Sequence, residues 1–212
     1  MKVLFFGSTG MVGQGVLREC LNDPVVSEVI SVVRRSTGRS HPKLREIVHA
    51  DFADFSTLRF DADACFWCLG VSSNGMTEAD YSRITHGYTI AAARSMPPRL
   101  TFVFVSGQGA DRDLMWARVK KRTEDDLFAM AFNAVYVFRP GFIQPLDGIR
   151  SRTKLYNALY PVLYPVMLAM KLLAPRQITD TRRIGRAMLN VARKGFPRKI
   201  LDNPDINMAA EE

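Results

Sequence analysis

Short, mostly apolar runs recur along the first two thirds of the chain, and each ends at a glycine, a serine or a charged residue. The runs are five or six residues long, which is typical of the buried strands of a parallel sheet. We expect six such strands, at residues 2–6, 29–33, 46–50, 64–69, 100–105 and 134–138.

Between these runs, apolar residues return every three or four positions, which is the spacing of a helix with one buried face. Strands that alternate with helices are joined by right-handed crossovers, so the strands are parallel and both faces of the sheet are covered. The sequence therefore predicts an α/β fold, a Rossmann-like doubly wound parallel sheet in three αβα layers. We expect its helices at residues 12–21, 78–96, 118–130 and 184–192, the last one capped by Gly195.

The first run is followed at once by Gly7-Ser8-Thr9-Gly10-Met11-Val12-Gly13. Glycines at this spacing permit a tight turn, let the backbone approach a pyrophosphate, and let the following helix pack against the strand. The N-terminus of that helix adds free N–H groups and the positive end of a dipole. Because the motif follows a strand and opens a helix, it predicts a dinucleotide-binding turn.

The second strand ends in Arg34-Arg35 rather than in an acidic residue. A carboxylate there would bind the ribose hydroxyls of NAD(H) and repel a 2′-phosphate, whereas an arginine pairs with that phosphate. We therefore expect NADP(H) as the cofactor, with NAD(H) as the alternative.

Other cofactor contacts are expected where later strands end, because ligands bind outside the carboxyl ends of parallel strands. Asp51 and Phe52 follow the third strand and would lie beside the adenine. Leu69, Gly70 and Val71 follow the fourth strand, where Gly70 would let the chain pass close to the adenosine ribose.

The ordered set of motifs resembles an atypical short-chain dehydrogenase/reductase, an NAD(P)-binding oxidoreductase or epimerase-like family. Within it, the sequence looks most like the branch of the Tat-interacting tumour suppressor and the NmrA-like regulators. The pieces that carry this resemblance are Gly7–Gly13, Asp51-Phe52, Cys68-Leu69-Gly70, Val105-Ser106, Val119-Lys120 and Arg139-Pro140-Gly141-Phe142.

The resemblance implies a catalytic unit of a serine, a tyrosine and a lysine. In that family the serine orients the substrate oxygen, the tyrosine transfers a proton, and the lysine binds the nicotinamide ribose and lowers the tyrosine pKa. Ser106 matches the serine and Lys120 the lysine, and both would also contact the cofactor. Further cofactor contacts are expected from Pro140, Gly141, Phe142 and Ile143.

The tyrosine position is occupied by Trp116. An indole N–H donates a hydrogen bond but is not an acid or a base near neutral pH. Aligning Lys121 instead of Lys120 would place Ala117 at the tyrosine position, which is no better. Replacement proton donors that we consider are Asp111, Asp113, Tyr81 and Tyr88.

Two functions remain open. The first is an NADP(H)-dependent oxidoreductase that acts on a small carbonyl, alcohol or quinone-like substrate. The second is a non-catalytic dinucleotide sensor whose partner contact depends on cofactor occupancy, which Trp116 favours. The net charge of +8 suits anionic ligands, but no nucleic-acid reader motif accompanies the basic residues, so we do not expect nucleic acid as a partner.

The 212 residues suit a single NAD(P)-binding domain, with a nucleotide-binding core over 1–145 and substrate-side helices over 146–212. In the second part, Leu155–Ala174 is strongly apolar and has basic flanks, but Pro161 and Pro165 interrupt it. It is too short and too broken to span a membrane. We favour a wall or lid over the substrate cleft, and leave a membrane-surface contact or a homodimer contact open.

The cysteines and histidines predict no metal site. Cys65 and Cys68 form a CxxC pair inside an apolar run, where their side chains need not converge, and His41, His49 and His86 have no ligand spacing. A low, odd cysteine count favours a reducing compartment. Because the first strand begins at Lys2, we expect no cleavable leader and a cytoplasmic protein.

Overall fold

The computed structural model describes residues 1–149 and 177–212. The predicted lid, Leu155–Ala174, and its basic flanks therefore lie outside the described residues. Among the helices that the structure describes, none combines the length and the apolar character that crossing a membrane requires.

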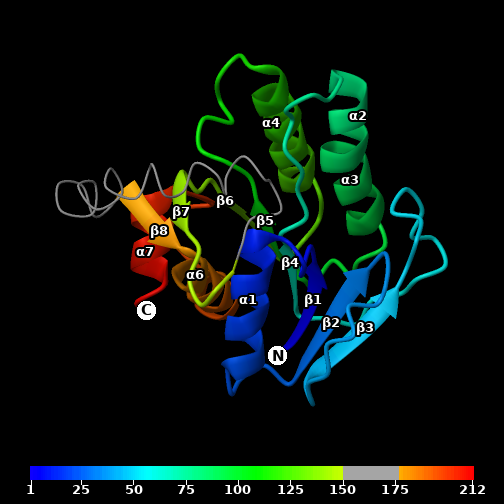
Figure 1. The fold of residues 1–212 in the computed structure, drawn as a ribbon, viewed down its shortest axis with the longest axis vertical. Helices are drawn as coiled ribbons and strands as arrows, with labels where there is room; N and C mark the ends of the chain where they lie inside the picture. Colours follow the sequence, from blue (N-terminus) through cyan, green and yellow to red (C-terminus); the bar gives the residue numbers. More distant parts are fainter. Residues whose placement is uncertain (150–176) are drawn as a thin grey trace.

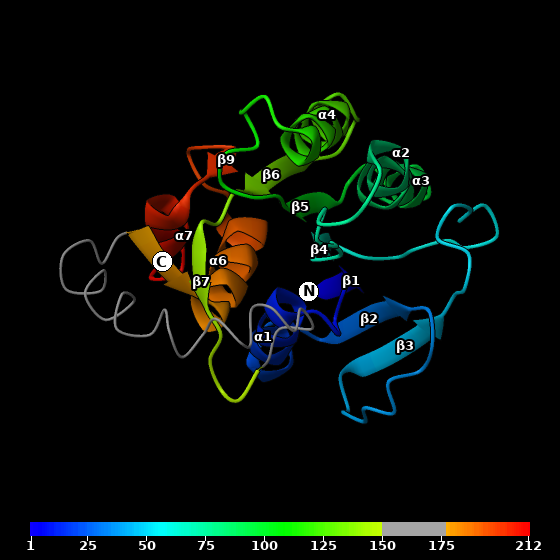
Figure 2. The ribbon, with the colours of Figure 1, turned by 45° about the horizontal axis from the view of Figure 1, so that its top comes forward.

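The described residues form a central sheet of seven parallel strands in the order β3-β2-β1-β4-β5-β6-β9 (Figure 1; β9 is labelled in Figure 2). This order confirms the predicted α/β fold with a Rossmann-like, doubly wound sheet. The strands are β1 Lys2–Phe6, β2 Glu28–Val33, β3 Leu44–Val48, β4 Ala64–Trp67, β5 Thr101–Val105, β6 Ala134–Phe138 and β9 Ile200–Leu201.

The central strands are apolar on both faces because helices or aromatic side chains cover both. Along β1, Val3 and Phe5 belong to the core on one side of the sheet, whereas Leu4 and Phe6 belong to the core on the other. Successive side chains of a strand point to opposite faces. A strand buried on both sides therefore reads as a continuous apolar run, which is why the sequence reveals it.

Helices lie in two layers, one on each side of the sheet (Figure 2). One layer holds α1 Met11–Asn22, α6 Thr181–Lys194 and α7 Asn203–Ala209. The other holds α2 Glu78–Ser82, the π-helical turn η1 Arg83–Gly87, α3 Tyr88–Ala93 and α4 Met115–Phe128.

Helices α1 and α6 approach each other closely because each presents a glycine to the other. A Cβ at Gly15 would stand 2.5 Å from the Cβ of Thr181, and one at Gly185 would stand 3.1 Å from the Cα of Val16. A side chain at either position would hold the two helices apart. The packing of the helix that follows the glycine-rich turn thus depends on a helix near the other end of the chain.

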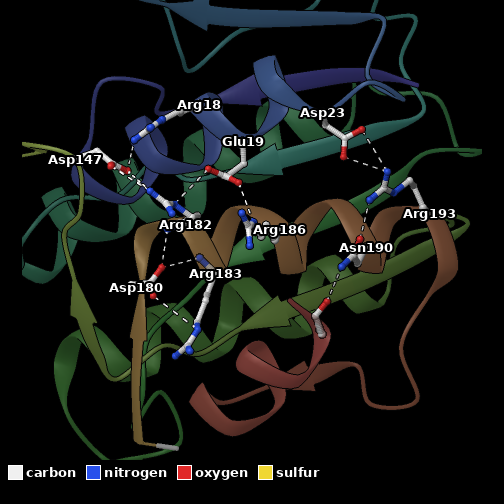
Figure 3. Close-up of polar contacts among 11 residues, drawn as sticks. Arg18, Glu19, Asp23, Asp147, Asp180, Arg182, Arg183, Arg186, Asn190 and Arg193 are labelled. Carbon is white, nitrogen blue, oxygen red and sulfur yellow. Dashed lines mark hydrogen bonds and ion pairs between the residues drawn. The ribbon is translucent and has the colours of Figure 1, made fainter. Parts of the chain in front are cut away.

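A set of ion pairs runs along the junction of α1 and α6 (Figure 3). Glu19 binds Arg186 at 3.1 Å, and Asp23 binds Arg193 at 3.1 Å. Asp147 has a positive φ of 58° and contacts both Arg18 of α1 and Arg182 of α6. These charges therefore satisfy one another across the helix junction.

Several predicted boundaries are wrong. The helix expected over 78–96 is interrupted by the π-helical turn η1 and ends at Ala93, and the helix expected from 118 begins at Met115. The strand expected over 46–50 spans Leu44–Val48. As a half-exposed edge strand, β3 carries only a weak apolar signal, which explains the shift in its predicted ends.

Some features of the fold were not predicted. The segment between β3 and β4 contains no helix that would cover the sheet. Phe52, Phe55 and Phe60 from this segment pack into the core instead. Two short strands, β7 Phe142–Gln144 and β8 Ile178–Asp180, pair in parallel outside the main sheet. Because β9 joins the sheet beside β6 and α6 covers one face of it, the boundary at residue 145 separates elements that pack together.

Candidate functional site

The candidate site lies where the strand order of the sheet reverses. From β1 the chain adds β2 and β3 on one side, and then crosses to add β4, β5 and β6 on the other. Ligands of open parallel sheets bind in the crevice outside the carboxyl ends of the strands at such a point. The glycine-rich turn after β1 and the chain after β4 meet at this edge.

Gly7 is fixed as glycine by its backbone and by its neighbour. Its φ is +84°, and a Cβ would stand 2.5 Å from the carbonyl carbon of Cys68 and from the amide nitrogen of Leu69. A conformation with positive φ is open to glycine and strained for other residues. The turn after β1 therefore presses directly on the backbone that leaves β4.

Gly10 and Gly13 complete the turn. The amide of Gly10 donates to the carbonyl of Gly7 at 3.0 Å, and a Cβ at Gly13 would stand 2.0 Å from the same carbonyl oxygen. Gly10 caps α1 without a side-chain hydrogen bond, and the first turn of the helix carries no acidic residue. The first N–H groups of α1 are thus open to an anionic ligand such as a phosphate.

The side chains within the turn differ in their surroundings. Ser8 is buried, and its hydroxyl accepts a hydrogen bond from Ser31 of β2 at 2.9 Å. The carbonyl of Thr9 accepts from the Gln14 side chain at 3.3 Å. Met11 and Val12 form the first turn of α1. Ser8 therefore fastens the turn to the sheet.

Arg34 and Arg35 are exposed immediately after β2, and neither has an ion-pair partner within the described residues. The loop that follows is held by Glu46 of β3, which accepts from the Ser36 hydroxyl at 2.9 Å and from the Thr37 amide at 3.0 Å. The two arginines thus precede an ordered loop, and their guanidinium groups face solvent.

Asp51 and Phe52, which lie in the loop after β3, have different surroundings. Asp51 is exposed, and its carboxylate accepts from the Ala53 amide at 2.9 Å. Phe52 is buried and packs edge-on against Phe6, with ring centroids 6.1 Å apart. The structure therefore brings Asp51 to the surface and places Phe52 in the core beneath it.

After β4 the chain is open. Gly70 is exposed, and nothing within 4 Å would meet a Cβ there. Val71 is 40% exposed, whereas Leu69 is partly buried and its amide lies against Gly7. Leu69 thus belongs to the glycine turn, and the backbone at Gly70 is accessible from the crevice.

Ser106 is buried at the end of β5, and its hydroxyl donates to the Glu124 carboxylate at 2.5 Å. The next residue is Gly107, where a Cβ would stand 3.8 Å from the Trp116 ring. The sequence pointed to Ser106 as the residue that faces the substrate. In the structure the position that faces Trp116 is 107, and the Ser106 proton is engaged by Glu124.

Lys120 is buried on α4, and its Nζ donates to the carbonyl oxygen of Val105 at 3.0 Å. The same nitrogen lies 4.9 Å from the ring centroid of Phe104. Burial lowers the pKa of this amine to about 8, against the opposing influence of the Glu124 carboxylate. The ammonium therefore remains the main form at pH 7, and it titrates only slightly above that pH.

The segment after β6 is anchored by Asn203. The amide of Gly141 donates to the Asn203 side chain at 3.1 Å, and that side chain donates to the carbonyl of Phe142 at 3.2 Å. The carbonyl of Pro140 accepts from the Gln108 amide at 3.0 Å. Ile143 and Phe142 lie in β7. The segment therefore lies beside the loop that follows β5.

The four alternative proton donors have different surroundings. Tyr81 is buried on α2, which raises the pKa of its phenol. Tyr88 packs on Phe52 at 6.0 Å between ring centroids. Asp111 and Asp113 are exposed, and Asp113 binds Arg118 at 2.8 Å. Tyr81 and Tyr88 thus contribute to packing, and the two aspartates face solvent.

The described residues contain no group of histidines, cysteines and carboxylates that could hold a metal ion. Burial raises the pKa of the Cys65 and Cys68 thiols, which disfavours their reactive thiolate forms. His86 binds Asp126 at 2.7 Å, and His49 contacts the carbonyl of Asp54 at 2.7 Å.

The residues that sequence reasoning missed are Gly107, Glu124 and Asn203. Glu124 follows Lys120 by one helical turn, so it lies on the same face of α4, and this spacing was the signal available. Gly107 directly follows the candidate serine. Asn203 lies far from Gly141 in the sequence, and no local pattern could have linked the two.

Comparison with solved structures agrees with this geometry. A short-chain dehydrogenase/reductase oxidoreductase from Burkholderia thailandensis superposes with a TM-score of 0.66 at 14% identity, covering 98% of this chain and 92% of that one. A short-chain dehydrogenase/reductase superfamily protein from Agrobacterium tumefaciens, with bound NAD, gives 0.64 at 17% identity over 95% and 77%. The chain therefore shares the Rossmann-like α/β fold of these proteins.

Comparison with curated sequences finds fungal relatives. The Aspergillus oryzae protein fmp52-1, mitochondrial, is 31% identical over 150 residues, which cover 65% of this chain and 63% of that protein. The chain thus matches less than two thirds of that relative's length. The Candida albicans FMP52, mitochondrial, is 22% identical over 95% of this chain and 92% of its own length. No protein-family model matches the chain.

These comparisons correct one expectation and leave another open. The expectation of a cytoplasmic protein is contradicted, because the relatives are named mitochondrial proteins. It rested on the place of the first strand, and a strand carries no targeting signal. The specific branch of the Tat-interacting tumour suppressor and the NmrA-like regulators stays a prediction.

Proposed function

We propose that the chain is an NADP(H)-dependent oxidoreductase that transfers hydride to or from a small carbonyl, alcohol or quinone-like substrate. One observation carries the proposal: Gly7, Gly10 and Gly13 leave the backbone of the turn free of side chains at three positions, and no side chain caps the N-terminus of α1 that follows. Such a turn lets a pyrophosphate approach the backbone and the positive end of the helix dipole.

The choice of NADP(H) over NAD(H) rests on Arg34 and Arg35. Both are exposed after β2 without an ion-pair partner in the described ranges. A guanidinium at this place pairs with a 2′-phosphate, whereas a carboxylate would repel it. Among the structural relatives, the Agrobacterium protein contains bound NAD, so the cofactor preference needs a direct measurement.

Lys120 is the side chain that we assign to the nicotinamide ribose. Its ammonium is buried next to the end of β5, and ribose hydroxyls would give it hydrogen bonds that a carbonyl and an aromatic ring alone do not supply. When bound, the nicotinamide supplies or accepts the hydride. Of the chain's own residues, Trp116 would offer its indole N–H as a hydrogen-bond donor.

Calorimetric titration with NADPH and NADH tests the proposal. We expect Arg34→Ala to weaken NADPH binding by about tenfold, the value of one charge-assisted contact, and to leave NADH binding unchanged. Arg94→Ala, an exposed arginine just after α3, is the matched control and should alter neither. Equal loss of both nucleotides in Arg34→Ala would refute the 2′-phosphate contact, and no binding by the wild type would refute the proposed function.

The second candidate is a dinucleotide sensor without turnover, and the contact between Trp116 and Gly107 favours it. A tryptophan at this place supplies no proton, and Gly107 supplies no hydroxyl. A protein that binds NADPH at micromolar concentration but oxidises it with no aldehyde, ketone or quinone would support this alternative against the first.

A further inference from the structure

A buried polar cluster lies behind the candidate site. The Glu124 carboxylate is 1% exposed, and it binds the Ser106 hydroxyl at 2.5 Å through Oε1. Arg139 donates to it twice, from Nη2 to Oε2 at 2.5 Å and from Nε to Oε1 at 3.2 Å. Glu124 thus joins α4 to the end of β5 and to the end of β6.

Lys120 and Glu124 bind consecutive residues of β5 and the loop after it. Lys120 holds the Val105 carbonyl at 3.0 Å, and Glu124, one turn later on α4, holds the Ser106 hydroxyl. Any shift of Ser106 would therefore move the Val105 carbonyl, to which the Lys120 ammonium donates its hydrogen bond. The two contacts fix the height of α4 above the carboxyl end of β5.

The charges of Glu124 and Arg139 compensate each other within the cluster. A buried carboxylate is costly unless it is paired, and the Arg139 guanidinium, whose side chain is 12% exposed, supplies the pairing. The hydrogen bond to Glu124 in turn raises the pKa of Arg139. Glu124 is the charged group that raises the pKa of the Lys120 amine against its burial.

Most of the other ionisable groups around α4 are engaged elsewhere. Tyr81 of α2 is buried as a neutral phenol with a raised pKa. Several of these charges pair with one another: His86 with Asp126, Arg118 with Glu78 and Asp113, and Lys121 with Asp125. Arg122 of α4 is exposed and has no ion-pair partner among the described residues. Asp111 and Asp202 add to the negative charge that raises the pKa of Arg139.

We propose that Glu124 and Arg139 are positioning residues for Lys120, which they hold in place and keep protonated for the cofactor ribose. This inference rests on the proposed function for its purpose, but the effect on Lys120 is a property of the protein alone. Glu124 acts through its negative charge and through Ser106. Arg139 supplies the opposite charge, so the Glu124 carboxylate is buried as part of an ion pair.

Opposite effects of two substitutions follow from this arrangement. Glu124→Gln removes the negative charge near Lys120, so the Lys120 pKa should fall by about one unit, at the low end of the range for a nearby opposite charge. Arg139→Met leaves the Glu124 charge uncompensated and removes a positive charge, so the Lys120 pKa should rise. A role in packing alone predicts no such pair of opposite shifts.

The test is an NMR titration of the cofactor-free protein labelled with ¹³C at the lysine Cε, with Lys120 assigned through Lys120→Arg. We expect a midpoint of about 8 in the wild type, a lower one in Glu124→Gln and a higher one in Arg139→Met. Lys2, whose pKa is raised by its hydrogen bond to Asp61, serves as an internal control whose midpoint should be the same in every variant. Shifts of equal sign, or none, would overturn the proposal.

Breaking a buried pair can prevent folding, because it leaves one charge alone. The double variant Glu124→Gln with Arg139→Met removes both charges and keeps the Lys120 measurement accessible. Its Lys120 midpoint should lie between those of the single variants. A double variant that folds and titrates outside that interval would contradict the proposed balance.

The pH dependence of NADPH binding links the cluster to the cofactor. The dissociation constant should rise above the Lys120 midpoint of each variant, so the two profiles move together. If the wild type binds no NADPH at any pH, the proposed function fails while the lysine titration still decides the role of Glu124. If NADPH binds but the pH dependence of its dissociation constant does not follow the Lys120 midpoints of the variants, the assignment of Lys120 to the ribose is wrong.

Discussion

Gly107 lies directly against Trp116, so that a Cβ at position 107 would stand 3.8 Å from the indole ring. The position at which the resemblance to short-chain dehydrogenases/reductases implies a tyrosine thus holds an indole, and the residue beside that indole has no side chain. The Ser106 hydroxyl, one residue earlier, donates to Glu124 inside the protein. The described part of the proposed site is therefore poor in proton donors for a carbonyl substrate.

Trp116→Tyr should increase carbonyl reduction with NADPH. A positioned proton donor contributes about 10²–10⁴-fold to such rates, and the phenol would stand one helical turn before Lys120. Steady-state oxidation of NADPH with a panel of aldehydes and ketones measures the gain.

Trp116→Phe is the control for that experiment, because it opens the same space without a hydroxyl group. A rise in both variants would show that Trp116 blocks the site sterically. A rise in neither would show that another group limits turnover.

Gly7→Ala should both destabilise the protein and abolish nucleotide binding. The positive φ and the contact at 2.5 Å with the Cys68 backbone together cost about 1–3 kcal/mol or more. Urea denaturation gives the free energy of unfolding. Gly75→Ala is matched, since Gly75 has a φ of +75° but nothing within 4 Å of a Cβ. It should lose only about 1 kcal/mol, and equal losses would argue against the close approach to β4.

Gly15→Ala should destabilise the protein although alanine is the better helix former. The added Cβ would stand 2.5 Å from the Cβ of Thr181 and 2.8 Å from its carbonyl oxygen, and overpacking of this kind costs about 1–3 kcal/mol. Thermal unfolding measures the change. At Gly87 the nearest atom to a Cβ is 3.9 Å away, so Gly87→Ala should instead stabilise the protein by about 0.5–1 kcal/mol. A gain in both variants would contradict the tight α1–α6 junction.

Lys120→Met should flatten the pH dependence of stability between about pH 8 and 10.5. The Lys120 pKa is lowered to about 8 by burial, so in this interval the unfolded chain binds a proton that the folded chain has released. Stability therefore rises with pH there, and the full rise is about 3 kcal/mol at 1.36 kcal/mol per pKa unit. Urea midpoints at pH 7, 8, 9 and 10 measure it.

In the same experiment, Lys121→Met should keep the wild-type slope, because Lys121 is exposed and bound to Asp125. A wild-type slope that persists in Lys120→Met would mean that another group titrates in this range.

Local signals made the nucleotide half of the fold predictable. β1 is buried on both faces, so its apolar run is unbroken, and the turn from Gly7 to Gly13 needs glycine for reasons that are local to those residues. The order of these segments was enough to predict a parallel sheet. Edge strands were harder, because β3 is half-exposed and β9 has only two residues.

The polar cluster was beyond sequence reasoning because its parts meet only in the folded protein. Ser106, Glu124 and Arg139 stand on three elements, and no spacing among them has a periodic meaning. The resemblance to short-chain dehydrogenases/reductases identified Ser106 as the candidate serine, and the structure shows that its hydroxyl donates to Glu124. The identity of the residue beside Trp116 likewise depends on how the loop after β5 lies over α4.

The junction of α1 with α6 has a consequence for synthesis. The ribosome completes β1, the glycine turn and α1 long before α6 emerges, since Glu19 and its partner Arg186 are 167 residues apart. Until then the flank of α1 that contains Gly15 has no cover, and a fold dominated by such distant contacts forms slowly. A nascent chain halted before residue 181 would carry the complete glycine-rich motif and still lack the helix that packs on it, so we expect such chains to need a chaperone.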